Sequence, residues 1–331
     1  MENYMLLTLV VPAYNEVESV RLFYDTVEET FRGKVEDYEV VFVDDGSTDG
    51  TFSVLKALNS EHRNVRVISF SRNFGKEAAI YAGLEASRGD LVCLIDADLQ
   101  QHPRVVLEML SEMEADEDID CVTAFQKKRK ENKLTSALKS AFYKTISKIS
   151  DIDFVNGASD FRLMKRKMVD AILSMSEYHR FSKGIFGFVG FNTKYIPYEV
   201  ERRVAGESKW SLRKLFKYAF GGISSFSTAP LKISTYIGFI CSFSAIAYLI
   251  WVVLEKLIWG IDVPGYATLV VLTLLIGGIQ LFCLGIIGSY IAKIHIESKK
   301  RPIYIASRVL DSTDSLSKEQ ASSEAEKQLL S

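Results

Sequence analysis

Two long stretches near the carboxyl end of the chain contain no charged residue. Residues 233–254 and 266–292 lack Asp, Glu, Lys, Arg and His altogether. A helix of about 20 apolar residues is long enough to cross the roughly 30 Å hydrocarbon core of a bilayer. We therefore predict two transmembrane helices at these positions. The alternative, a pair of helices buried in a soluble core, is hard to fit into a domain of this size.

Basic residues surround both stretches, whereas the linker between them holds a single Lys. Because Lys and Arg collect on the cytoplasmic side of membrane proteins, we predict that both ends of the chain face the cytoplasm. Residues 209–220 interleave Lys and Arg with aromatic and apolar side chains, as in an amphipathic helix at a lipid surface. A helix packed on its own domain with a solvated basic face is the alternative.

Overall charge and cysteine usage exclude several classes of function. The formal net charge of −2 argues against nucleic acid as a partner. The four cysteines are far apart and show no CxxC spacing, so neither a disulfide framework nor a thiolate metal site is expected. This pattern is typical of a reduced soluble part that faces the cytosol.

Short apolar runs alternate with amphipathic segments over residues 6–124. The runs are LLTLVV, YEVVFVDD, NVRVISF, DLVCLIDAD and DCVTAF. They are continuously apolar, as strands covered on both faces are, and they predict an α/β fold with a mostly parallel sheet. A further strand is predicted at residues 160–164 and a helix at residues 132–149.

Acidic residues follow the predicted strands. Asp96 and Asp98 come after the fourth run, and carboxylates of this kind suit Mg²⁺ or Mn²⁺. Such a pair is weak evidence alone, because turns are rich in Asp. However, PAYNE at 12–16 and DDGSTDG at 44–50 end the first two runs, and parallel sheets bind ligands at the edge where their strands end.

These two motifs also have a purely structural explanation. Thr48 and Asp49 would then only cap the following helix, and Glu16 would only interact with the positive N-terminal end of its own helix.

These motifs resemble those of the family-2 glycosyltransferases of the GT-A fold, in particular their polyprenyl-phosphate branch. That branch includes the bactoprenol glucosyltransferases and the dolichol-phosphate mannose synthases. The resemblance covers nearly the whole chain and rests on PAYNE, DDGSTDGT, FSRNFGKEAA at 70–79, DADLQQHP at 96–103, GASDFRLM at 157–164, GESKW at 206–210 and RPIY at 301–304.

The resemblance implies a domain plan. A cytosolic GT-A (Rossmann-like) catalytic domain would span residues 1–208, followed by amphipathic juxtamembrane helices at 209–232 and the transmembrane helices at 233–254 and 266–292. Residues 293–331 would form a cytosolic segment, and their Ser-, Glu-, Lys- and Gln-rich end after about residue 311 predicts a disordered tail.

The resemblance also implies roles for individual residues. The nucleotide sugar would be bound by Pro12, Tyr14, Glu16, Asp44, Asp45, Lys76 and Asp96, and Arg72 is a further candidate. The metal ion, Mg²⁺ or Mn²⁺, would be held by Asp96, Asp98 and Gln100. The acceptor phosphate would be held by Arg129, Arg162, Arg202 and Lys209. The catalytic candidates are Asp98 and Asp160, although Asp160 would alternatively position the acceptor or pair with a nearby arginine.

The implied reaction is an inverting transfer of a hexose to polyprenyl (undecaprenyl) phosphate at the cytosolic face of a bacterial inner membrane. UDP-glucose is the expected donor, with UDP-N-acetylglucosamine, UDP-galactose and GDP-mannose as alternatives. A processive polysaccharide synthase would need more spans and a QxxRW motif, and an inactive membrane scaffold would not need Asp96, Asp98 and Gln100 intact. Small residues in the second span, such as Gly277 and Gly288, would allow copies of the chain to pack together.

Overall fold

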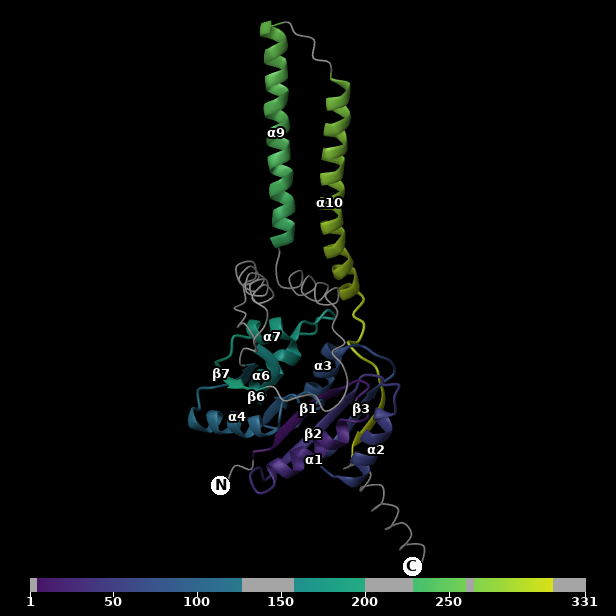
Figure 1. Cartoon of the computed structure of the whole chain (residues 1–331), viewed down its shortest axis with the longest axis vertical. Coiled ribbons are helices and arrows are strands. Elements are labelled where there is room, and N and C mark those ends of the chain that lie inside the picture. The colour runs from purple at the N-terminus through teal and green to yellow at the C-terminus, as the bar shows by residue number, and fades with distance from the viewer. Residues whose placement is uncertain (1–4, 127–157, 200–228, 260–264, 312–331) are drawn as a thin grey trace, which may run out of the picture. The chain divides into compact units, whose positions relative to one another are not determined.

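The computed structural model describes residues 5–126, 158–199, 229–259 and 265–311 (Figure 1). These residues belong to two compact units, an α/β unit that includes the chain after Pro302 and a helical unit that ends at Arg301. The helices predicted at 132–149 and 209–220, and the tail predicted after residue 311, lie outside the described residues.

The α/β unit is built on a mixed sheet with the strand order β7-β5-β6-β4-β1-β2-β3-β8. Neighbouring strands are parallel in β1–β2, β1–β4, β2–β3 and β5–β7, and antiparallel in β4–β6, β5–β6 and β3–β8. The strands are β1 (Leu7–Ala13), β2 (Tyr38–Asp44), β3 (Val65–Phe70), β4 (Leu91–Leu94), β5 (Cys121–Gln126), β6 (Ala158–Lys165), β7 (Thr193–Tyr198) and β8 (Ala306–Asp311). The predicted α/β class and mostly parallel sheet are thus confirmed.

Helices cover both faces of this sheet, which explains why the strands are continuously apolar. In β2, Val40 and Phe42 join a cluster with α1, α2 and α4, whereas Val41 and Val43 pack against α3. A side chain at Gly83 of α3 would come within 2.2 Å of Val10, so this glycine permits close packing on β1. The helices are α1 (Val20–Phe31), α2 (Thr51–Glu61), α3 (Lys76–Ala86), α4 (Arg104–Ala115), α6 (Arg166–Ser174) and α7 (Ser182–Phe188).

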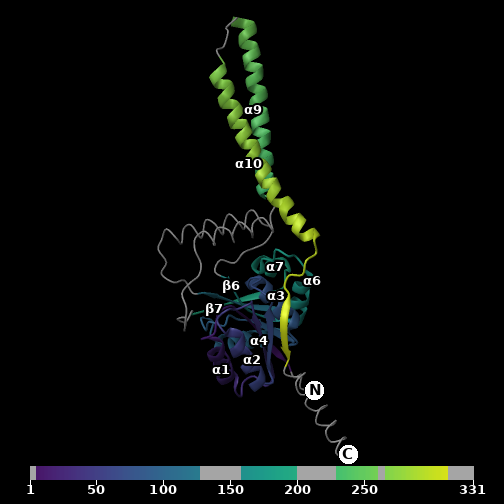
Figure 2. The ribbon, with the colours of Figure 1, turned by 90° about the vertical axis from the view of Figure 1, so that its right-hand side faces the viewer.

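Two strands, β7 and β8, were not expected from the sequence. Strand β7 holds Pro197, and β8 comes from the segment after the apolar stretches, which the sequence analysis treated as a separate tail-bearing region. β8 pairs antiparallel with β3, so the chain returns to the sheet of the α/β unit (Figure 2). The α/β unit therefore includes residues from both ends of the chain.

The helical unit consists of α9 (Ala229–Trp259) and α10 (Tyr266–Ser298), which run side by side (Figures 1 and 2). Within each of Leu231–Glu255 and Val271–Ser298, the most apolar 18 residues have a mean hydropathy of 2.3. By length and composition, both helices could cross a membrane, at positions that overlap the predicted spans.

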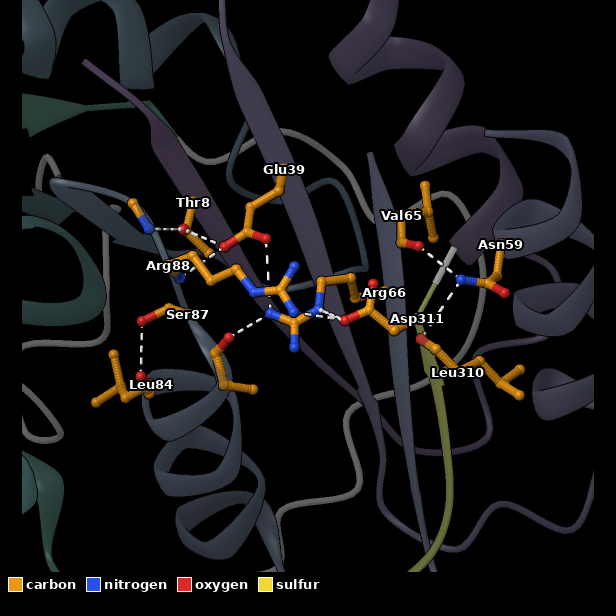
Figure 3. A network of polar contacts seen from close by, with 12 residues as sticks. Thr8, Glu39, Asn59, Val65, Arg66, Leu84, Ser87, Arg88, Leu310 and Asp311 are labelled. Atoms are coloured by element: carbon orange, nitrogen blue, oxygen red, sulfur yellow. Dashed lines mark hydrogen bonds and ion pairs between the residues drawn. The ribbon is translucent and has the colours of Figure 1, made fainter. Parts of the chain in front are cut away.

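A polar network ties β8 to the centre of the sheet (Figure 3). Glu39 accepts hydrogen bonds from the Thr8 hydroxyl and the Arg88 backbone N–H, each at 2.7 Å. The Arg66 guanidinium lies between Glu39, at 3.6 Å, and Asp311, at 3.2 Å, and Arg88 reaches Asp311 at 2.6 Å. Because the Glu39, Arg66 and Asp311 side chains are mostly buried, loss of one partner leaves a poorly compensated charge.

We expect Asp311→Ala to lower the free energy of unfolding by about 2 kcal/mol, because Arg66 loses its nearer carboxylate. Chemical denaturation of the detergent-purified protein measures this loss. The matched control is Glu112→Ala, which removes the carboxylate of the more exposed pair with Lys194 and should change stability little. If both variants lose the same free energy of unfolding, the buried network does not stabilise the fold more than an exposed ion pair does.

Candidate active site

The turns after β1 and β2 are joined by hydrogen bonds. Ala13 and Asp44 are register partners, so both strands end at the same edge of the sheet. The Asn15 backbone N–H donates to the Ser47 hydroxyl at 2.9 Å, and the Thr48 N–H donates to the Asn15 side-chain oxygen at 2.9 Å. The PAYNE and DDGSTDG motifs therefore lie side by side at this edge of the sheet.

Helix capping is the alternative explanation for part of these motifs, and the N-cap residue of α2 is Gly50, directly after Asp49. The Asp49 carboxylate accepts the Thr51 N–H at 3.0 Å and the Thr51 hydroxyl at 2.5 Å, at the start of α2. Burial opposes ionisation, but these hydrogen bonds outweigh it and lower the pKa of Asp49. The Glu16 carboxylate accepts the Ser19 hydroxyl at 2.6 Å, just before α1. Nucleotide contacts by Glu16, and by Pro12 and Tyr14 beside it, stay predictions.

Asp44 and Asp45 are both buried, and both organise the loops around them. The Asp44 carboxylate accepts the Ser47 N–H at 3.0 Å and the Ser69 hydroxyl at 2.8 Å, which connects the end of β2 with β3. These contacts explain why an acidic residue stands at the end of a buried strand. Direct contact of either carboxylate with a nucleotide stays a prediction.

The Asp45 carboxylate holds the loop at residues 71–75. It accepts the backbone N–H of Phe74 at 2.6 Å and that of Gly75 at 3.0 Å. Burial raises the pKa of Asp45, and the two N–H groups oppose that rise. A side chain at Gly46 would meet the backbone carbon of Arg72 at 2.5 Å, so the loop lies directly on this glycine. Asp45 and Gly46 together therefore fix where α3 begins.

Lys76, the first residue of α3, lies between two carboxylates from other parts of the chain. Its Nζ is 2.7 Å and 3.0 Å from the two oxygens of Asp96, which follows β4, and 3.4 Å from Asp160 in β6. Partial loss of contact with water alone would lower the pKa of the half-exposed Lys76, but the two carboxylates raise it on balance. Burial opposes ionisation of Asp160, yet Lys76 and then Lys183 lower its pKa. Lys76 and Asp160 are therefore both charged at neutral pH.

Gln101 also belongs to this cluster, although no sequence pattern pointed to it. Its buried side chain accepts the Asp96 backbone N–H at 3.0 Å and donates to the Asp96 carboxylate at 3.3 Å. The described hydrogen bond of Gln100 runs from its backbone N–H to Asp98, at 3.1 Å. Two adjacent glutamines give no sequence signal for which one faces Asp96, and metal binding by Gln100 stays a prediction.

Asp96 and Asp98 suit a divalent cation that brings further ligands with it. Among the described residues, no group of three or more His, Cys, Asp and Glu side chains could hold a metal ion. Mg²⁺ and Mn²⁺ bind through one or two carboxylates when phosphate oxygens and waters complete the shell. The donor set therefore fits such a cation together with a diphosphate, rather than a cage made of protein ligands.

Arg162, a candidate for the acceptor phosphate, lies inside the α/β unit. Its guanidinium carbon stacks 3.6 Å from the Phe186 ring centroid, and its N–H groups donate to the backbone oxygens of Asp160 and Ser159. Burial lowers its pKa. This position disfavours direct contact with a lipid phosphate. The other candidates, Arg129, Arg202 and Lys209, lie outside the described residues.

A second basic residue near Asp160, Lys183, was also missed. Glu77 in α3 accepts the Ser182 backbone N–H at 2.8 Å and also binds the Ser182 hydroxyl, which attaches α7 to α3. Lys183 follows in α7, and its charge helps to lower the pKa of Asp160. A lone lysine among apolar residues carries no sequence signal of such a role.

Comparison with known proteins assigns the chain to a family. Residues 8–173 match the model of glycosyl transferase family 2. The chain belongs to this family. It is a glycosyltransferase with a GT-A-like α/β fold, as the resemblance implied. Residues 229–294, which cover most of α9 and α10, match the GtrB C-terminal hairpin, and together with their hydropathy they indicate that this family-2 enzyme is membrane-associated.

Several relatives match almost end to end. A putative glycosyltransferase CsbB of Bacillus subtilis is 42% identical over 91% of each chain. A prophage bactoprenol glucosyl transferase homolog of Escherichia coli is 41% identical and covers 92% of this chain and 99% of the relative. The bactoprenol glucosyl transferase of Shigella phage SfV is 41% identical, with coverage of 91% and 98%.

A solved structure, glucosyl-3-phosphoglycerate synthase from Mycobacterium tuberculosis, is more distant. It is 21% identical, covers 66% of this chain and 76% of its own, and has a TM-score of 0.46. That likeness is too low to bear on the site. The family assignment therefore rests on the sequence matches.

We expect Asp45→Asn to loosen the loop at residues 71–75, because an amide offers one acceptor oxygen where the carboxylate offers two. Hydrogen exchange at the Phe74 and Gly75 amides should become about tenfold faster. The control is Asp116→Asn, whose carboxylate accepts the Asp118 N–H in an exposed turn. Unchanged exchange at Phe74 and Gly75 would show that Asp45 does not hold the loop.

Proposed function

We propose that this enzyme transfers glucose from UDP-glucose to polyprenyl (undecaprenyl) phosphate, with inversion at the anomeric carbon. The observation that carries the proposal is the 41% identity to chains named bactoprenol glucosyl transferase, which extends over 98% of the SfV relative. Such coverage includes both the α/β unit and the apolar hairpin. The carboxylate-rich edge of the sheet supports the use of a sugar donor that carries a diphosphate.

The donor diphosphate would lie at the carboxyl ends of β1, β2 and β4, where the three strands bring their polar turns together. Asp96 and Asp98 would hold Mg²⁺ or Mn²⁺ there. When bound, that cation stabilises the negative charge on the departing diphosphate. Lys76 supplies a further positive charge beside Asp96. The loop that precedes Lys76 is held by Asp45.

The lipid phosphate would act as the nucleophile. One of its oxygens forms a bond to the anomeric carbon, while the bond from that carbon to the diphosphate oxygen breaks and the diphosphate leaves with the electron pair. A phosphate monoester is already ionised at neutral pH, so no residue needs to remove a proton. Asp160 then has a positioning role, since it lies 3.4 Å from Lys76 and its ionisation is favoured by Lys76 and Lys183.

Membrane attachment would bring the site to its lipid substrate. The two apolar helices would cross a bacterial inner membrane, with the catalytic unit and both ends of the chain in the cytosol, because the basic residues flank the spans and the linker has a single Lys. Arg129, Arg202 and Lys209 are the proposed contacts for the acceptor phosphate.

The purified enzyme should form a labelled sugar-lipid from UDP-glucose, short-chain polyprenyl phosphate and Mn²⁺. The measurement also includes UDP-N-acetylglucosamine, UDP-galactose and GDP-mannose as donors. Asp98→Asn should reduce the rate by about 100-fold or more, because one carboxylate for the cation is lost. Asp116→Asn, in an exposed turn, is the control.

Each part of the proposal has its own contrary result. If no donor yields a sugar-lipid, transfer to a polyprenyl phosphate is wrong. If another donor is used in preference to UDP-glucose, only the choice of sugar is wrong. An Asp98→Asn variant as active as Asp116→Asn would contradict the role of Asp98.

A further inference from the structure

Lys76 already occupies the carboxylate that the proposed divalent cation needs. Its Nζ lies within 3.0 Å of both Asp96 oxygens, so neither oxygen is left without a positive neighbour. A Mg²⁺ or Mn²⁺ ion bonded to Asp96 would therefore lie beside the Lys76 ammonium group. Two neighbouring cations repel each other strongly at a partly buried site.

The Lys76 ammonium group has other anionic partners within reach. The Lys76 side chain is 44% exposed and rooted at the first residue of α3, so it can rotate without disturbing the packed core. Asp160, 3.4 Å away, provides a second carboxylate. A bound diphosphate would provide further anionic oxygens, and Lys binds such groups as a mobile point charge.

We propose that Lys76 is an internal counter-cation, which keeps Asp96 neutralised until the donor arrives and then moves from Asp96 to the donor's diphosphate. The divalent cation and the nucleotide consequently bind cooperatively, and the cation alone binds weakly. This inference rests on the proposed metal site at Asp96 and Asp98. It adds that Lys76 controls the order in which that site fills.

The test is the affinity of the full-length protein for Mn²⁺, measured by electron paramagnetic resonance with and without UDP. In the wild-type enzyme, UDP should tighten Mn²⁺ binding by roughly tenfold or more. Lys76→Met should tighten Mn²⁺ binding without UDP by roughly tenfold, and UDP should then add much less. Lys76→Arg keeps the positive charge and should retain the weak binding of Mn²⁺ alone.

Lys167→Met is the matched control. Lys167 lies 2.6 Å from Asp120 in a pair of the same type, formed between α6 and the residue just before β5. Its loss should leave Mn²⁺ binding unchanged. Lys76→Gln repeats the charge removal with a polar side chain, and the unfolding midpoint of each variant identifies any loss that reflects misfolding.

Two contrary outcomes separate this inference from the proposed function. If Mn²⁺ binds the wild-type enzyme with UDP, but Lys76→Met and Lys76→Gln leave the affinity for Mn²⁺ alone unchanged, then Lys76 does not compete with the cation and the inference is wrong. If Mn²⁺ does not bind the wild-type enzyme even with UDP, the metal site itself is wrong and the inference fails with it.

Discussion

The buried carboxylate of Asp45 accepts the backbone N–H groups of Phe74 and Gly75, and the geometry of the site follows from that contact. It fixes the loop that crosses Gly46, and the loop fixes the first residue of α3. Lys76 therefore lies close to Asp96, which follows β4, and to Asp160 in β6. By holding this loop, Asp45 at the end of β2 positions Lys76 beside Asp96.

The chain that follows the apolar helices also contacts this loop and the end of β3. The Ser71 N–H donates to the Ile305 backbone oxygen at 2.9 Å, and the Tyr304 ring stacks on Phe70. Further on, β8 completes the sheet, and Asp311 joins the buried network with Arg66. Residues that are distant in sequence from the site therefore stabilise the strand and loop that carry it.

Sequence patterns predicted those parts of the fold that depend on local order. Continuous apolar runs located most strands, and the acidic residues after them include Asp96, which pairs with Lys76 at the end of β4. β8 escaped prediction because ASRVLD has no continuous apolar run, and β7 because Pro197 interrupts a strand pattern. The contact of Lys76 with Asp96, and the burial of Arg162 against Phe186, arise from tertiary packing that no local pattern encodes.

The decisive measurement is a structure of the full-length enzyme with Mn²⁺ and UDP, in which anomalous scattering locates the metal. We expect Mn²⁺ to be bound by Asp96 and Asp98 against the diphosphate, with the Lys76 ammonium moved from Asp96 to a phosphate oxygen. We also expect the Asp45 contacts with Phe74 and Gly75 to persist. Mn²⁺ bound elsewhere, or a Lys76 still paired with Asp96 beside the bound metal, would contradict these expectations.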